Sequence, residues 1–295
     1  MVQLAPVGTY HMPDSLAECL DRVADGGDGL VVLAGGQAIL PLLKNRSLRP
    51  EVLVDLSAVA ELRRREIAAD GTLMLGAMRR HRELYEDRAI QSGWSALADA
   101  AAAIGDLQVQ NRGTIGGNLV FGTVLTDLKQ VVMCLDGRLR VVGRSGVREV
   151  AARALFGDPG HALLEPGELL DSIALPPLPE RSGSAYRKFG ITTNGRPVIG
   201  IAAALTIGAD GICTGASIVV GGLVPAPCEA RIAAQVLIGQ AIDEDVIVHA
   251  ALAAADEIKP QSDARASASY RRQLVRAIGR EVLGQAWQRA IGRTC

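Results

Sequence analysis

Two glycine-rich segments are the first candidates for holding an anionic ligand. One of them, residues 33–38, reads LAGGQA and follows a short apolar run. Glycines let consecutive backbone N–H groups converge into a concave nest, which binds an anion without Lys or Arg. A pyrophosphate would suit this nest, although an ordinary tight turn between a strand and a helix would use the same residues. The spacing is not G-x-G-x-x-G, so it does not predict a Rossmann nicotinamide site.

The second segment, residues 111–118, reads NRGTIGGN. Glycines at this density are hard to explain as core residues. They adjoin the hydroxyl of Thr114 and the amide of Asn118, which can both hydrogen-bond a ligand. The segment therefore favours a ligand-binding turn, with a plain surface loop as the alternative.

Thr126 and Asp127 form a third candidate, because they precede a run that is expected to be helical. The structural alternative is a helix cap, in which Thr126 caps the first turn and Asp127 favours the positive end of the helix. The functional interpretation is that the Asp127 carboxylate accepts hydrogen bonds from a sugar or a base.

The elements that must position these segments can be read from periodicity. A helix is expected at 15–24, where apolar residues recur on one face and Asp14 or Ser15 can cap the first turn. Strands at 30–33 and 52–56 enclose a short helix at 38–44, which makes a strand–turn–helix–strand unit. A strand at 72–77 and helices at 79–87 and 92–104 come next. The polar, glycine-rich stretch 105–118 leads to a helix at 127–135 and a strand at 138–142.

A proline-rich stretch at 176–179, followed by ERSGS, predicts a domain boundary. Beyond it, runs at 198–207 and 212–220 flank an Asp210-Gly211 turn and predict an antiparallel hairpin. Helical patterns at 229–238, 243–256 and 269–291 close the chain. The fold class is therefore α+β, with a first domain at 1–177 and a second, α+β domain at 184–291.

Composition excludes several classes of protein. The net charge of −1 does not indicate a nucleic-acid-binding surface, and no apolar run is long enough to span a membrane. The first residues resemble no signal peptide. The five cysteines are scattered without a CxxC pair, which indicates buried thiols, a cytoplasmic location and no metal centre on this chain. His81 and the run Arg63-Arg64-Arg65 are expected on solvated faces, and Cys134 in the core.

AGGQ at 34–37, TIGGN at 114–118 and the TDL that follows resemble the FAD subunit of the xanthine dehydrogenase and carbon monoxide dehydrogenase family. The combination is specific, and the resemblance covers nearly the whole chain. It implies a two-part FAD-binding domain of the vanillyl-alcohol oxidase type. A smaller α+β domain of the CO dehydrogenase flavoprotein type, with an antiparallel sheet and helices, is expected to follow.

The resemblance also implies roles for individual residues. The FAD-binding set is Leu33, Ala34, Gly35, Gly36, Gln37, Ala38, Thr114, Gly116, Gly117, Asn118, Thr126, Asp127, Leu164 and Lys188. Residues 34–38 would wrap the pyrophosphate, and Thr114, Gly117 and Asn118 would contact the phosphate and ribityl groups. Thr126 and Asp127 would hold the adenosine end. Leu164 would pack on a ring, and Lys188 would lie near the isoalloxazine and favour the anionic reduced form.

The function implied is electron transfer in a heterotrimeric molybdenum hydroxylase, an oxidoreductase. FAD would be bound non-covalently, and no catalytic or metal-ligating residue is expected on this chain. A small partner subunit with two [2Fe-2S] clusters and a large molybdopterin subunit would complete the complex, as a dimer of heterotrimers. Purines, other N-heterocycles, aldehydes and carbon monoxide are all substrates within the family. A self-contained flavoprotein oxidase or dehydrogenase is the alternative, and a flavin-free scaffold is a third interpretation.

Overall fold

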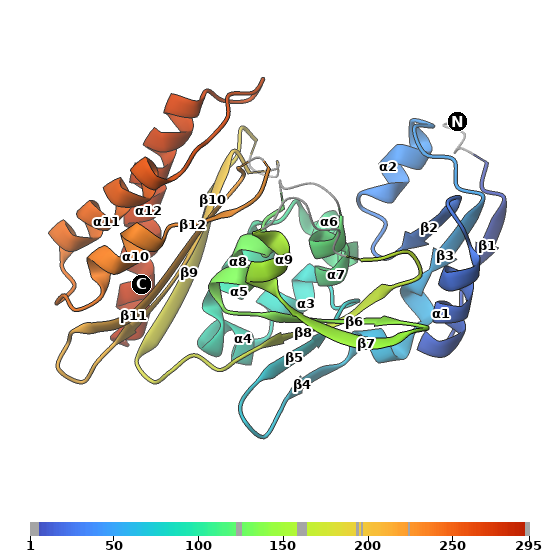
Figure 1. Ribbon diagram of the computed structural model, residues 1–295, viewed down its shortest axis with the longest axis horizontal. Coiled ribbons are helices and arrows are strands. Elements are labelled where there is room, and N and C mark those ends of the chain that lie inside the picture. The colour runs from blue at the N-terminus through green and yellow to red at the C-terminus, as the bar shows by residue number, and fades with distance from the viewer. Residues whose placement is uncertain are drawn as a thin grey trace.

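A computed structural model describes residues 6–121, 126–157, 164–192, 195, 197–223 and 225–292 of the chain. Within this part, three sheets follow one another across the molecule, and the C-terminal helices cover the outer face of the last sheet (Figure 1). The first two sheets form a two-part N-terminal region, and the third forms a separate α+β region. The expected α+β class is confirmed. His161, Leu163 and Cys295 lie outside the described residues.

The N-terminal sheet is parallel and small. Its strands run in the order β1 (Thr9–His11), β3 (Val52–Asp55) and β2 (Leu30–Leu33). Helix α1 (Leu16–Asp25) begins where the Ser15 hydroxyl accepts a hydrogen bond from Glu18 N, and it buries Cys19 and Val23 against the sheet. Helix α2 (Ile39–Lys44) lies between β2 and β3 in the chain. The predicted strand–turn–helix–strand unit is therefore confirmed.

The middle region is built on a five-stranded antiparallel sheet. The strand order is β4 (Arg65–Ile67), β5 (Leu73–Gly76), β8 (Leu169–Leu175), β6 (Arg138–Gly143) and β7 (Gly146–Ala151). Two 3-10 turns, Leu56–Ala58 and Ala60–Arg63, connect β3 to this sheet. The helices are α3 (His81–Tyr85), α4 (Arg88–Gly93), α5 (Ser95–Ala103), α6 (Leu107–Arg112), α7 (Ile115–Val120), α8 (Leu128–Cys134) and α9 (Ala152–Phe156).

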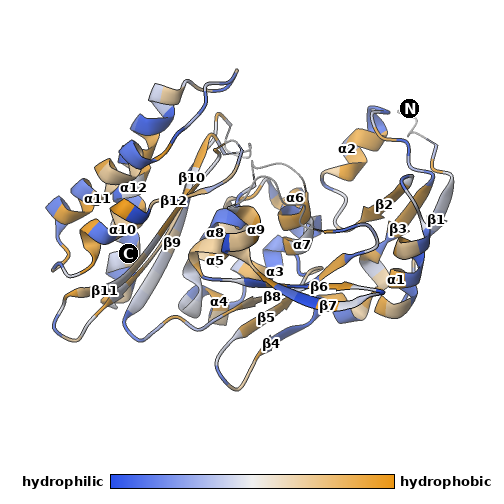
Figure 2. Ribbon diagram, viewed as in Figure 1, coloured by the Kyte–Doolittle hydropathy of each residue, from blue (hydrophilic) through white to orange (hydrophobic). Residues whose placement is uncertain are grey.

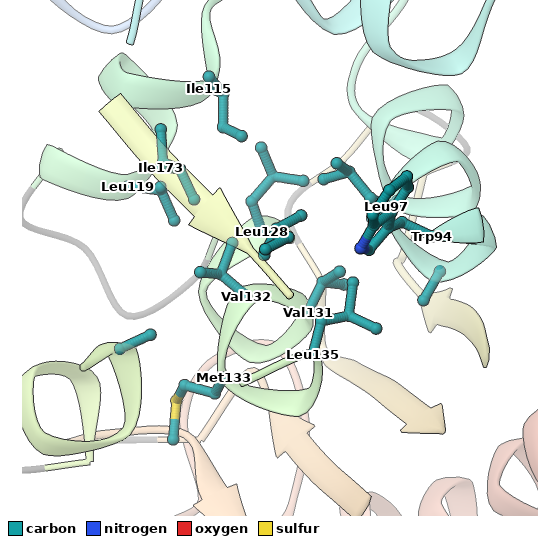
Figure 3. Close-up of a cluster of buried hydrophobic side chains, with 14 of the residues drawn as sticks. Trp94, Leu97, Ile115, Leu119, Leu128, Val131, Val132, Met133, Leu135 and Ile173 are labelled. Atoms are coloured by element: carbon teal, nitrogen blue, oxygen red, sulfur yellow. The ribbon is translucent and has the colours of Figure 1, made fainter. Parts of the chain in front are cut away.

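Helix α8 lies at the centre of the main core. Every residue from Leu128 to Cys134 is buried, and Figure 3 shows Leu128, Val131 and Val132 among side chains from α5, α7 and β8. Cys134 is in the core, as expected, and Cys19, Cys134, Cys213 and Cys228 are all free thiols. Because α8 is fixed on all sides, the residues just before it are held in place as well.

The C-terminal region is an antiparallel sheet with helices on one face. Its strand order is β12 (Cys228–Glu229), β11 (Cys213–Gly221), β10 (Ile199–Ile207) and β9 (Ser182–Phe189). The predicted hairpin is β10 and β11, joined through Asp210-Gly211. Helices α10 (Arg231–Leu237), α11 (Glu244–Glu257) and α12 (Ala268–Ala290) match the predicted helical patterns. The other face packs on α5 and α8, so this sheet contributes to both large cores.

Hydropathy follows this layering. Figure 2 shows mostly hydrophobic residues on β10, a central strand of the last sheet, and hydrophilic residues on β7, an edge strand of the middle sheet. In the described part of the chain, no helix is long and apolar enough to cross a membrane.

Three local predictions were wrong. The stretch 105–118 contains two short helices, α6 and α7, and the predicted helix at 92–104 is interrupted at Trp94, between α4 and α5. The arginine run is not a solvated face. Arg64 binds the buried carboxylate of Asp171, which also binds Arg140, and Arg65 binds Asp87. These arginines neutralise carboxylates at the sheet, and their pairing lowers the pKa of Asp171 although burial opposes it.

Candidate functional site

One cavity of about 680 Å³ brings together nearly all of the residues singled out in the sequence. This volume lies in the range of small-molecule and cofactor sites. The predicted residues in its wall are Ala34, Gly35, Gly36, Gln37, Ala38, Thr114, Gly116, Gly117, Asn118, Thr126, Asp127, Leu164 and Lys188. Leu33, the last residue of β2, is not among the lining residues. Segments far apart in the chain thus face one ligand-sized space.

The first glycine-rich segment offers free backbone donors. It turns sharply after β2, with Gly36 at φ +75°, a conformation that favours glycine. The amides of Gly36, Gln37 and Ala38 make no hydrogen bond to the described part of the chain. The Gln37 side chain donates to the Gly35 carbonyl at 3.2 Å and braces the turn from within. Free amides of consecutive residues beside a cavity are what an anionic group needs.

The second segment is built differently. Thr114 caps α7 by accepting a hydrogen bond from Gly117 N at 3.1 Å, and Gly116 N donates to the Ala77 carbonyl at 2.8 Å. Asn118 N donates to the Thr114 carbonyl, so the amides of this turn are already used. What the segment can still offer is the Thr114 hydroxyl proton and the side-chain N–H groups of Asn118. Its glycines permit close packing, because a Cβ on Gly116 would lie 2.6 Å from the Ala77 side chain.

The two glycine-rich segments touch each other. A Cβ on Gly35 would lie 2.2 Å from the Arg112 carbonyl oxygen, and one on Gly117 would lie 3.6 Å from the Ala34 Cβ. Neither contact is visible in the sequence, where the segments are separated by the whole first part of the middle region. The paired turns form one continuous wall of the cavity.

Asp127 does not cap α8. Its side chain makes no capping hydrogen bond, and the Thr126 hydroxyl is buried without a partner in the described structure. Asp127 Oδ1 instead accepts a hydrogen bond from the Tyr186 hydroxyl at 2.7 Å and lies 3.2 Å from Lys188 Nζ. Both partners of this ion pair are nearly buried, with side chains 7% and 8% exposed. Burial raises the pKa of Asp127, although Lys188 and Tyr186 both act to lower it.

The ion pair bears on two roles expected from the sequence. Asp127 was placed with the adenosine and Lys188 with the isoalloxazine, which are opposite ends of an extended dinucleotide. Because their charged groups are in contact, both residues lie at the same end of the cavity. Lys188 Nζ also donates to the Gly195 carbonyl at 3.1 Å, and Gly195 lines the cavity too.

His81 was wrongly expected on a solvated surface. It is 3% exposed and lines the cavity, because His81 N donates to the Gly113 carbonyl and sets the start of α3 against the second segment. A Cβ on Gly113 would lie 2.8 Å from the imidazole, so glycine leaves the ring its room. Burial lowers the pKa of His81 to about 4, and its Nδ1 has no partner among the described residues. The imidazole is therefore neutral at pH 7.

Sequence reasoning also missed the apolar part of the wall. The cavity is also lined by Met78, Ile104, Val109 and Phe121. Gly105, which follows Ile104 in the chain, lines it too. Apolar residues of this kind carry no pattern that separates a cavity wall from a core. Together with free amides, a buried unpartnered hydroxyl and a buried ion pair, they suit an elongated ligand with both anionic and ring-shaped parts.

Comparison with known proteins identifies the two regions. A family model described as "FAD binding domain in molybdopterin dehydrogenase" matches residues 4–178. A second, described as "CO dehydrogenase flavoprotein C-terminal domain", matches residues 184–286. The first match covers more than half of the chain and includes the cavity-lining segments at 34–38, 114–118 and 126–127.

Relatives cover the whole length. The chain is 33% identical to the 6-hydroxypseudooxynicotine dehydrogenase complex subunit alpha of Paenarthrobacter nicotinovorans, over 97% of this chain and 96% of that one. It is 32% identical to the carbon monoxide dehydrogenase medium chain of Afipia carboxidovorans, over 95% and 97%. A solved Cu,Mo-CO dehydrogenase chain matches with a TM-score of 0.90 at 30% identity. The match covers 97% of this chain and 100% of the solved chain. A chain of quinoline 2-oxidoreductase from Pseudomonas putida has a TM-score of 0.89.

Proposed function

Because this chain belongs to the family of FAD-binding subunits of molybdopterin dehydrogenases, we propose that it is the electron-transfer subunit of a heterotrimeric molybdenum hydroxylase. As such a subunit it is part of an oxidoreductase, and its cofactor is FAD. The observation that carries the proposal is the single cavity in which free amides, a buried unpartnered hydroxyl and an ion pair meet.

The residues in the cavity fit FAD in three places. The amides of Gly36, Gln37 and Ala38 would hold the pyrophosphate by hydrogen bonds. The Thr114 hydroxyl and the Asn118 amide would bind the neighbouring phosphate and ribityl oxygens. Both are donors on a rigid turn, so little side-chain entropy is lost when they bind.

We propose that Asp127 and Lys188 face the isoalloxazine rather than the adenosine. A buried cation beside the ring favours negative charge on the reduced flavin, whereas adenosine carries no charge for Lys188 to match. The apolar wall at Ile104 and Val109 would then take the adenine, and Leu164 would pack on a ring. When bound, FAD would accept electrons and release them singly or in pairs to an acceptor.

The complex is inferred from the relatives. Two of the similar proteins are named a medium chain and a subunit of a dehydrogenase complex. These names support a multi-subunit complex. We propose that the partners are a small subunit with two [2Fe-2S] clusters and a large molybdopterin subunit, in a dimer of heterotrimers. We also propose the domain division 1–177 and 184–291. A cytoplasmic location agrees with the free thiols of the described cysteines.

The flavin content of the purified chain tests this function. We expect a yellow protein that holds about one FAD per chain, bound non-covalently, and releases it into the supernatant on heat or acid denaturation. The released flavin should be identified as FAD by chromatography, with FMN as the comparison. A protein that binds no flavin under saturating FAD contradicts the proposal.

Flavin that stays with the precipitated polypeptide contradicts the non-covalent part. His81 would then be the first residue to substitute, because its imidazole lines the cavity. A His81→Ala variant that releases its flavin would identify the linked residue, and His249→Ala, in α11, is the matched control.

A further inference from the structure

A buried hydrogen-bond chain runs from the core to the Asp127–Lys188 pair. Gln130 Nε2 donates to the Tyr186 hydroxyl at 3.2 Å, and Tyr186 donates to Asp127 Oδ1 at 2.7 Å. Gln130 is fully buried, and Tyr186 is 3% exposed. These hydrogen bonds thus join α8 of the middle region to β9 of the C-terminal region, and they end at the Lys188 ammonium group on the cavity wall.

The neighbouring strands leave room for this polar chain. Gly200 on β10 and Gly221 on β11 are directly paired. A Cβ on Gly200 would lie 2.5 Å from the Tyr186 hydroxyl, and one on Gly221 would lie 2.5 Å from Gln130 Oε1. The missing side chains of the two glycines leave space on this sheet face, and the Gln130 amide and the Tyr186 phenol occupy it.

A contribution to folding stability does not explain this hydrogen-bond chain. Gln130 Oε1 has no hydrogen-bond partner among the described residues, and burying an unpaired carbonyl lowers the stability of the folded chain. An apolar side chain at 130 would avoid that cost while filling the same space. The polar residues are therefore better explained by their effect on Asp127 than by packing.

Tyr186 is also held firmly in position. Its backbone N–H donates to Asp99 Oδ2 at 3.1 Å, and Arg289 of α12 binds the same carboxylate at 2.6 Å. Its ring packs in the main core with α8. The hydroxyl therefore has a fixed direction toward Asp127, as a positioning group requires.

Given the proposed function, we propose that Tyr186, supported by Gln130, is a positioning residue that withdraws negative charge from Asp127 and so leaves more of the Lys188 charge available to the reduced flavin. Lys188 Nζ donates to Asp127 and to the Gly195 carbonyl. An ammonium group has three protons, so one remains for a ligand in the cavity. The stronger the Tyr186 hydrogen bond, the less completely Asp127 neutralises that cation.

The test is the midpoint potential of the bound flavin in Tyr186→Phe, which removes the hydroxyl and keeps the ring. We expect the affinity for reduced FAD, relative to oxidised FAD, to fall about tenfold. This equals a shift of about 30 mV to more negative potential for a two-electron couple. The dissociation constant of oxidised FAD should change by less than about threefold, which a general loss of structure would not allow.

Two further variants complete the experiment. Tyr85→Phe makes the same chemical change at a half-buried tyrosine that packs on the same core, and its potential should equal that of the wild type. Gln130→Met removes the donor to Tyr186 and should shift the potential in the same direction by a smaller amount. If Tyr186→Phe does not bind FAD, the shift of the flavin midpoint potential in Gln130→Met tests the inference instead.

Potentials of Tyr186→Phe and Gln130→Met that match the Tyr85→Phe control, or that move to more positive values, overturn the inference. These outcomes leave the proposed function intact, because the wild type would still bind FAD. A wild-type chain that binds no FAD overturns both.

Discussion

Gly36→Val is expected to weaken FAD binding at least about 100-fold, which corresponds to roughly 2.7 kcal/mol. Gly36 has φ +75° and lies in the turn whose amides are free beside the cavity. A β-branched residue strains this conformation, and relaxing the turn would move the free N–H groups away from the cavity. Isothermal titration of the flavin-free chain with FAD measures the effect, and circular dichroism should show that the fold remains.

Gly27→Val is the matched control. Gly27 has φ +60°, belongs to the same N-terminal region, and has open space where a Cβ would be. The substitution therefore introduces similar backbone strain away from the cavity. Equal FAD affinity in Gly36→Val and Gly27→Val would contradict the role assigned to the first turn. Gly117→Val, where the new side chain would meet the Thr114 hydroxyl and Ala34, should also lose FAD.

Removing either partner of the Asp127–Lys188 pair is expected to destabilise the flavin-free chain by about 3 kcal/mol. Asp127→Asn leaves an ammonium group that is nearly buried, and Lys188→Met leaves a nearly buried carboxylate. The double variant buries neither charge. The double variant should therefore lose less unfolding free energy than the two single variants together. Urea unfolding should give a coupling energy of about 3 kcal/mol.

The exposed pair Asp256–Arg276 provides the control cycle. Its atoms approach to 3.3 Å, but the side chains are 71% and 47% exposed. The coupling energy between Asp256→Asn and Arg276→Met should stay below about 1 kcal/mol, because water screens the pair. A coupling at Asp127–Lys188 no larger than at this surface pair would show that the cavity pair is not effectively buried.

Local features of the sequence predicted the supporting elements well. The β2–α2–β3 unit and the β10–β11 hairpin are apolar runs separated by glycine-containing turns, and the last three helices are helix-compatible segments. Their boundaries agree within a few residues. The stretch 105–118 was misjudged because glycine and polar residues disfavour helix locally, whereas contacts with α3 and Ala77 stabilise α6 and α7.

Features that depend on distant contacts could not be predicted. His81 is buried by Gly113, and Asp127 is bound by Lys188 and Tyr186, which lie about sixty positions further along the chain. The sequence singled out Asp127 and Lys188 separately but gave no sign that they pair. The structure also showed that the two glycine-rich segments differ. The backbone amides at 36–38 are free, whereas those of the second segment already donate hydrogen bonds within the protein.

The central claim is that electrons reach this chain from a partner subunit. Its most direct test is to measure flavin reduction by stopped-flow absorbance. The measurement is made on the FAD-loaded chain alone and on the reconstituted complex. Purines, other N-heterocycles, aldehydes and carbon monoxide should each be offered as substrate. We expect one of them to reduce the flavin in the complex, none to reduce it in the lone chain, and the reduction to disappear when molybdenum is removed. Substrate-driven reduction of the lone chain would contradict the account and identify a self-contained flavoenzyme.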